Sequence, residues 1–313
     1  MPLLRSREVF STPKTLIVRP HVRRVLQLAT EVSPLRKSLR LLGKSGLLPR
    51  PIWARLPVAG AFSVDLPSGS SFRYSSTVGD MSGRGLYWRG LLAFRNEGLA
   101  TFYRLAGRAK HVLDIGANTG VFTLVACAAT PDSVVTSFEP VPGLYRRVAD
   151  VVSMNGWRQR CEVRQQAVSN RVGSAPFHVP LGEVPSSASL DPTGFRGYDG
   201  SIIQVPVTTV DTVIPPGCSV DLVKIDVEGF EHLVLEGMQR VLRESSPDIF
   251  IECLPDGPYK AVEHILSSFG YCFFHVRNEQ LVRTPEIVPD PAGWNRNYLC
   301  RAASHAREAG ALE

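Results

Sequence analysis

The feature that most constrains the fold is a strict alternation of short apolar runs and amphipathic segments after residue 110. Lys110–Ile115 has the pattern of a buried strand around Val112, Leu113 and Ile115, and the helical pattern Thr119–Ala128 follows it. The alternation continues with strands at Ser133–Phe138, Cys161–Ala167, Asp221–Ile225, Asp248–Glu252 and Tyr271–Val276, helices at 142–155, Phe230–Arg243 and Pro258–Phe269, and a last edge strand at Tyr298–Arg301. Strands and helices that alternate at these lengths predict an α/β fold with a doubly wound, mostly parallel sheet covered on both faces.

Four segments are predicted along the chain. Residues 1–56 form a basic helical extension rich in Arg and Leu, and residues 57–80 form a small β-hairpin. The main domain covers residues 81–302, and 303–313 is a short flexible tail. Within the main domain, a helical pattern spans 87–105, and residues 172–210 have the turn-rich pattern of an inserted antiparallel hairpin.

The positive charge is concentrated in the extension. Residues 1–55 hold twelve Lys and Arg against two acidic residues, so the rest of the chain is net acidic although the whole carries +6. We therefore expect no nucleic-acid partner, because such a protein more often carries a basic face on its main body. We expect the extension to pack on its own domain or on a second copy in a homodimer, to bind an anionic membrane or an acidic protein, or to be disordered.

Composition excludes several other classes. The six cysteines are scattered and include no CxxC pair, so neither a zinc site nor a disulfide framework is expected. No apolar run reaches the roughly 18–20 residues that span a bilayer. The first residues also lack the pattern of a secretory signal, because charges follow Leu4 at once. We expect a cytoplasmic protein.

The turn after the first strand is the first candidate site. Gly116 and Gly120 let the backbone bend sharply and approach a ligand closely, and Asn118 stands where a dinucleotide motif GxGxxG has its second glycine. Ligands of open α/β sheets bind at this carboxyl edge. Asp114 would repel a pyrophosphate, but it would suit the amino group of S-adenosylmethionine (SAM), directly or through water.

Two further positions complete a predicted SAM site. Glu139 ends the second strand, where a carboxylate can accept both ribose hydroxyls. Gln166 and Ala167 end the third strand, where the adenine edge should lie. Taken with Asp114 and the glycine turn, these residues favour SAM over a nicotinamide or flavin nucleotide.

A second cluster lies at the end of the strand Asp221–Ile225. We expect the side chains of Asp226 and Glu228 on one face of the strand end. They could act as a base with its orienting partner, or as two oxygen ligands for a cation such as Mg²⁺. We assign no metal. Lys224 is the third candidate catalytic residue, and Glu252 is its expected carboxylate partner. Asp226 and Glu228 would also suit the N-terminus of the next helix, which is the structural alternative.

Several weaker candidates remain. Trp88 and Glu97 could wall the pocket, and His275 is an alternative base. His232 and Asn155 are more simply structural, as a helix residue and a helix cap.

These motifs resemble the FkbM family of SAM-dependent methyltransferases over residues 85–277. The resemblance rests on the stretches 112–120 and 138–140, on Thr209-Val210-Asp211, and above all on Lys224-Ile-Asp-Val-Glu-Gly-Phe-Glu231 with Ile251-Glu252. It implies an O-methyltransferase that acts on a hydroxyl of a sugar, glycolipid or polyketide-type product. A methyltransferase directed to nitrogen or a carboxylate, and a non-catalytic binding module, are the alternatives. The extension is not part of the family pattern.

Overall fold

The computed structural model describes residues 58–182, 188–190, 199–293 and 295–303, with a few positions between 38 and 56. Residues 58–313 form one compact unit and residues 1–57 another. Within the extension, residues 38 and 40–43 are helical, and the rest of its predicted helices lies outside the residues described. The predicted tail also lies outside them, apart from residue 303.

An eight-stranded sheet forms the centre of the unit, in the order β12-β11-β13-β10-β9-β3-β4-β5. Its strands are β3 (His111–Ile115), β4 (Val134–Phe138), β5 (Cys161–Arg164), β9 (Leu222–Ile225), β10 (Asp248–Glu252), β11 (Tyr271–Arg277), β12 (Gln280–Thr284) and β13 (Asn297–Ala302). The five strands from β10 to β5 are parallel, and β13 runs antiparallel to both of its neighbours. The predicted α/β class and mostly parallel sheet are confirmed.

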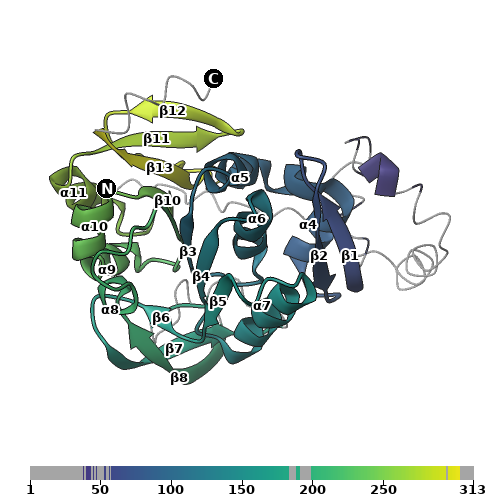
Figure 1. Ribbon diagram of the computed structural model, residues 1–313, viewed down its shortest axis with the longest axis horizontal. Helices are drawn as coiled ribbons and strands as arrows, with labels where there is room; N and C mark the ends of the chain where they lie inside the picture. The colour runs from purple at the N-terminus through teal and green to yellow at the C-terminus, as the bar shows by residue number, and fades with distance from the viewer. Residues whose placement is uncertain are drawn as a thin grey trace, which may run out of the picture. The chain divides into compact units, whose positions relative to one another are not determined.

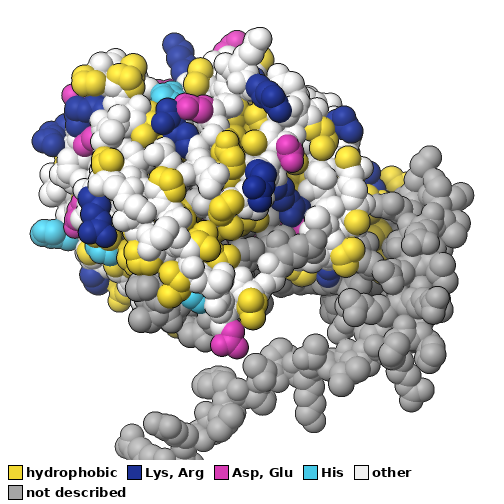
Figure 2. Space-filling model, turned by 90° about the horizontal axis from the view of Figure 1, so that it is seen from below, with side chains coloured by type: hydrophobic (Ala, Val, Ile, Leu, Met, Phe, Trp, Pro, Cys, Tyr) yellow, Lys and Arg dark blue, Asp and Glu magenta, His cyan; other side chains and the backbone are white. Residues whose placement is uncertain are grey.

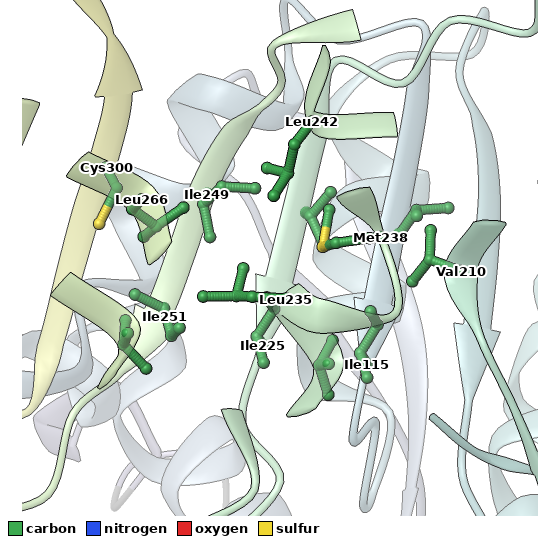
Figure 3. Packing of buried hydrophobic residues seen from close by; sticks show 14 of the residues in the cluster. Ile115, Val210, Ile225, Leu235, Met238, Leu242, Ile249, Ile251, Leu266 and Cys300 are labelled. Carbon is green, nitrogen blue, oxygen red and sulfur yellow. The ribbon is translucent and has the colours of Figure 1, made fainter. Parts of the chain in front are cut away.

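Helices cover both faces of this sheet (Figure 1). One side carries α5 (Leu99–Ala106), α6 (Val121–Ala129) and α7 (Pro142–Met154), and the other carries α8 (Val210–Val213), α9 (Glu231–Glu236), α10 (Gln239–Ser245) and α11 (Tyr259–Ser268). Strand alternation divides the apolar residues between the two sides. Phe250 of β10 packs on Phe102 of α5 with ring centroids 5.6 Å apart. Its neighbours Ile249 and Ile251 pack with Leu235 and Leu266 in the opposite core (Figure 3).

Two smaller β elements complete the unit. The predicted N-terminal hairpin is confirmed as β1 (Gly60–Asp65) paired antiparallel with β2 (Ser71–Ser76). The predicted inserted hairpin is confirmed as β7 (Gly173–Pro180) and β8 (Gly200–Thr208). These two strands join the short β6 (Ala167–Val168) in a separate three-stranded sheet.

The structure corrects four of the predicted elements. The strand expected at Cys161–Ala167 splits, because β5 joins the main sheet and β6 the small one. The helical pattern 87–105 is three pieces, α4 (Met81–Arg89), the 3-10 helix η1 (Gly90–Glu97) and α5, separated at Gly90 and Gly98, which both have positive φ. The helix expected at Phe230–Arg243 breaks into α9 and α10 at Gly237.

The fourth correction concerns the order of the strands. The segment Tyr298–Arg301 was expected at an edge, but β13 lies between β10 and β11, and the unpredicted β12 forms that edge. None of the described helices has the length and apolar character needed to cross a membrane.

Candidate active site

A cavity of about 440 Å³ lies at the carboxyl ends of β3, β4, β9 and β10 and reaches the small sheet. Figure 2 views the molecule from the side where Figure 1 shows the small sheet, with hydrophobic side chains gathered across the middle of that face. Five acidic and two basic side chains line the cavity: Glu97, Glu139, Asp226, Glu228 and Glu252, with Lys224 and Arg296. A lining of this charge favours a ligand with net positive charge.

The glycine turn forms one wall. Gly116 has a φ of +82°, and a Cβ built there would fall 1.9 Å from the carbonyl oxygen of Asp226, so only glycine fits. Asn118 lies beside it, with a φ of +50°. Gly120 lies outside the lining of the cavity, and its assignment as a binding residue stays a prediction. It precedes α6 in the left-handed conformation and packs against Val148.

Glu139 lies at the base of this wall. Its carboxylate accepts the backbone N–H of Asn118 at 2.7 Å and that of Val141 at 2.9 Å, and the residue is 4% exposed. Burial raises the pKa of Glu139 to about 7, against the lowering effect of the two backbone donors. Each oxygen still has a lone pair to offer to a ligand hydroxyl. Gln166, between β5 and β6, and Ala167, the first residue of β6, also line the cavity.

Asp114 lies outside the lining of the cavity, so its predicted contact with a ligand, directly or through water, stays a prediction. It is fully buried, and its Oδ2 accepts the hydroxyl of Thr123 on α6 at 2.6 Å. Strand alternation turns this side chain toward α6, whereas the neighbouring Ile115 lines the cavity. Burial raises the pKa of Asp114, and Lys224 opposes that shift.

Lys224 connects the two walls. Its Nζ donates to the carbonyl of Gly116 at 2.9 Å and lies 3.6 Å from Asp114 Oδ1 and 3.4 Å from Asp226 Oδ2. The prediction that Lys224 forms its ion pair with Glu252 is therefore wrong. Burial lowers the pKa of Lys224, but Asp226 and Asp114 outweigh burial and raise it above its usual value. Lys224 stays protonated and cannot act as a base.

The second wall is a group of three acids, Asp226, Glu228 and Glu252, termed here the carboxylate cluster. One oxygen of each lies within 4.8 Å of the others. Glu228 has a φ of +52°, so the expected extended strand does not continue to it. Glu252 was expected only as a partner for lysine. It pairs with Arg296 at 3.5 Å, and burial, with Asp226 and Glu228 beside it, raises its pKa well above the usual value.

The role at the N-terminus of α9, considered above for Asp226 and Glu228, belongs to the neighbouring Glu231. Glu231, not Asp226 or Glu228, accepts the backbone N–H groups of Val227 and Gly229 before α9, at 3.3 and 3.1 Å. Asp226 and Glu228 instead line the cavity. This arrangement leaves both carboxylates directed to the ligand space.

The weaker candidates divide clearly. Glu97 lines the cavity, and Trp88 is buried away from it. His275 is buried, accepts from Arg277 at 2.9 Å and lies 2.8 Å from the carbonyl of Asn295, so both ring nitrogens are engaged away from the cavity. His232 lies outside the lining. Asn155 caps α7 and also binds the backbone of Arg73 through both side-chain atoms, at 2.7 and 2.8 Å.

Sequence reasoning missed part of the lining. Ser82 and Phe94 come from α4 and η1, Phe177 and Leu190 from the insert, and Arg296 from the segment before β13. None of them belongs to a motif. The signal lay only in their segments, around 80–100, 172–210 and 277–296, which the sequence predicts to set the choice of acceptor.

The sheet order, the glycine turn and the acidic cavity define a Rossmann-like methyltransferase domain. The model of the Methyltransferase FkbM domain matches residues 114–275, about half of the chain. The chain belongs to the FkbM methyltransferase family, and it is a methyltransferase.

Individual relatives are distant. Methyltransferase sdnD of Sordaria araneosa is 24% identical over 190 residues, which cover 51% of this chain and 73% of that protein. The crystal structure of Methyltransferase FkbM from Methylobacillus flagellatus KT is 18% identical, with a TM-score of 0.40. That match covers 61% of this chain and 43% of the solved one, so the chain spans less than half of its length. The O-methyltransferase TomG from Streptomyces achromogenes, solved with SAM, is 13% identical over 66% of this chain and 79% of TomG, with a TM-score of 0.38.

Proposed function

We propose that this methyltransferase transfers the methyl group of SAM to a hydroxyl of a sugar, glycolipid or polyketide-type acceptor. The observation that carries the proposal is the facing of two walls across one cavity. The glycine turn with Glu139 forms one wall, and the carboxylate cluster forms the other. The residues of the first wall can bind a cationic nucleoside. A carboxylate of the second wall can accept a proton from the acceptor.

The residues present fit SAM. Position 116 must be glycine because the carbonyl oxygen of Asp226 occupies the space of a Cβ, and the backbone of the turn lines the cavity. Glu139 would accept the ribose hydroxyls through its remaining lone pairs, and Gln166 and Ala167 would border the adenine. The excess of acidic side chains favours the net positive charge of SAM over a pyrophosphate. Bound SAM would supply a methyl group activated by its sulfonium.

Asp226 is the proposed proton acceptor. Its side chain is 33% exposed, against 12% for that of Glu252, so within the carboxylate cluster it is the more accessible of these two. The Asp226 carboxylate would take the proton of the acceptor hydroxyl as that oxygen receives the methyl group that bound SAM supplies. Lys224, which stays charged, orients that carboxylate. Glu228 lies beside it and would receive a hydrogen bond from the acceptor.

The test is Asp226→Asn in the full-length protein. Loss of a general base lowers the rate by about 100-fold or more. SAM binding, measured by calorimetry, should change little, because Asn keeps the shape of the side chain. Asp132→Asn, at an exposed acid in the turn before β4, is the matched control and should keep wild-type turnover.

Turnover is measured as formation of S-adenosylhomocysteine with panels of hydroxyl, amine and carboxylate acceptors. Full activity of the Asp226→Asn protein on a hydroxyl acceptor would refute the role of Asp226. Activity restricted to amines or carboxylates would refute O-methylation. Failure of the wild-type protein to bind SAM would refute the cofactor assignment.

A further inference from the structure

An aromatic ring lies against the ammonium of Lys224. Lys224 Nζ lies 5.1 Å from the centroid of the Phe122 ring, a distance at which a cation is attracted to the electron-rich face of the ring. Phe122 is the second residue of α6, directly after the glycine turn, and it lines the cavity. The reaction proposed for Asp226 and Glu228 leaves this ring without a role.

Two other rings hold Phe122 in place. Its ring is roughly perpendicular to that of Phe102 on α5, with centroids 5.0 Å apart, and is tilted against that of Phe250 on β10 at 6.1 Å. Both of these neighbours are fully buried. Because buried side chains are closely packed, a ring fixed by two of them can in turn fix the group that lies against it.

The ammonium lies between two acids that compete for it. Nζ is 3.6 Å from Asp114 Oδ1 and 3.4 Å from Asp226 Oδ2, and both distances exceed the roughly 2.7–2.9 Å of a strong charge-assisted hydrogen bond. The short bond among its contacts goes to the carbonyl of Gly116, at 2.9 Å. A contact that depends on neither acid is therefore needed to fix the ammonium between them, and the Phe122 ring supplies one.

We propose that Phe122 is a positioning residue for methyl transfer, because its ring fixes the Lys224 ammonium and, through it, the carboxylate of Asp226. The ring also shields the ion pair, since Lys224 is only 3% exposed although it lines the cavity. An ammonium shielded from water attracts a carboxylate more strongly than a hydrated one does. The role of Asp226 as proton acceptor rests on the proposed function, whereas the contact between ring and ammonium does not.

The first test measures this contact and needs no cofactor. Phenylalanines with one, three and five ring fluorines are placed at residue 122 of the full-length protein by amber suppression. Fluorine withdraws electron density from the face of the ring and nearly keeps its shape, so the attraction for a cation weakens at each step. The equilibrium constant for unfolding in urea should rise stepwise, by about tenfold at five fluorines, an effect between those of exposed and desolvated pairs.

Phe102 is the matched position for the same series. Its ring packs against both other rings, and within the described part of the chain no Lys or Arg lies over its face. Fluorines at residue 102 change the packing and the apolar surface as they do at residue 122, but they weaken no attraction for a cation. The unfolding constant should therefore show no stepwise rise.

The second test separates turnover from binding in the same proteins. With whichever acceptor is methylated, kcat should fall by about tenfold along the series at residue 122, because the Asp226 carboxylate loses its orientation. The Kd for SAM should stay within about twofold. The glycine turn is held independently of the ring, since the backbone N–H groups of Gly116 and Ala117 donate to the carbonyl of Phe138 at 3.1 and 3.0 Å.

Two ordinary substitutions repeat the comparison. Phe122→Tyr keeps an electron-rich face and should retain wild-type kcat. Phe122→Leu keeps apolar bulk without such a face, and its kcat should fall as far as that of the protein with five fluorines. If Phe122→Leu does not fold, the fluorinated series, which keeps the ring, decides alone.

The outcomes separate this proposal from the proposed function. A flat unfolding series at residue 122, or an equal rise at residue 102, overturns the contact. Weaker SAM binding at constant kcat makes Phe122 a wall of the cofactor site and overturns the positioning role. That role is also overturned if Asp226→Asn loses turnover while the fluorinated proteins keep it. If Asp226→Asn keeps full turnover, the assignment of the base fails, and a stepwise unfolding series still upholds the contact of ring and ammonium.

Discussion

Replacing Lys224 by Met should strongly destabilise the fold. Lys224 is 3% exposed, and its Nζ is the counter-charge of Asp114, which is fully buried. Asp114 Oδ1 makes no hydrogen bond within the described part of the chain. Methionine keeps most of the apolar stem but leaves that carboxylate without a cation. Removing one partner of a buried ion pair costs about 3–5 kcal/mol, which is a large part of the stability of a typical domain.

The loss should depend on pH in a defined direction. Burial already raises the pKa of Asp114 above 3.8, and Lys224 holds it down, so the Lys224→Met variant raises that pKa further. A carboxyl whose pKa is higher in the folded than in the unfolded protein destabilises the fold when ionised. Protonation of Asp114 relieves this cost as the pH falls. The deficit of the variant should therefore be larger at pH 8 than at pH 5.

Urea unfolding followed by circular dichroism at both pH values measures this effect. Lys260→Met is the control, because Lys260 is exposed and forms its ion pairs with Glu263 and Glu286 at the surface, where such pairs contribute little. A variant with both Lys224→Met and Asp114→Asn should recover most of the lost stability, since no buried charge remains unpaired. A Lys224→Met protein as stable as Lys260→Met would refute the reasoning.

Two further predictions concern the ligand. Glu139 must be ionised to accept ribose hydroxyls, and its pKa is about 7, so SAM affinity should fall as the pH drops from 8 to 6. The Glu139→Gln variant should bind SAM more weakly and lose this dependence; an unaltered pH profile in titration calorimetry would count against the ribose assignment. EDTA should leave turnover unchanged, because Lys224 and Arg296 already neutralise two of the three acids in the carboxylate cluster. Activity lost with EDTA and restored by Mg²⁺ would favour a metal.

The parallel core of the sheet was predictable because its signals are local. Runs such as Val112–Ile115 and Leu222–Ile225 are apolar at strand length, and each ends at a glycine or an acid. Parallel strands bring those ends to one edge, so the meeting of Glu139 with Asp226 at one cavity follows from the sequence alone. The place of β13 did not follow, because insertion between β10 and β11 is decided by tertiary packing.

Side-chain direction at the strand ends was the harder problem. The sequence alone did not show whether Asp114 lies in the ligand space or beneath it, because the answer depends on Thr123 in the helix packed against it. Glu252 was recognised but given the wrong partner, since Arg296 lies in a segment with no periodic pattern.

These networks have a joint consequence for the glycine turn. Lys224 holds the turn from the sheet side, through the Gly116 carbonyl, and pairs with Asp226 of the carboxylate cluster. Glu139 holds the same turn from the next strand, through the backbone N–H of Asn118. A turn fixed from two sides by buried polar groups is ordered before any ligand arrives, which lowers the entropy that binding must remove. Because Lys224 contacts both the Gly116 carbonyl and the Asp226 carboxylate, a displacement of Lys224 should disturb the turn and the proposed base together.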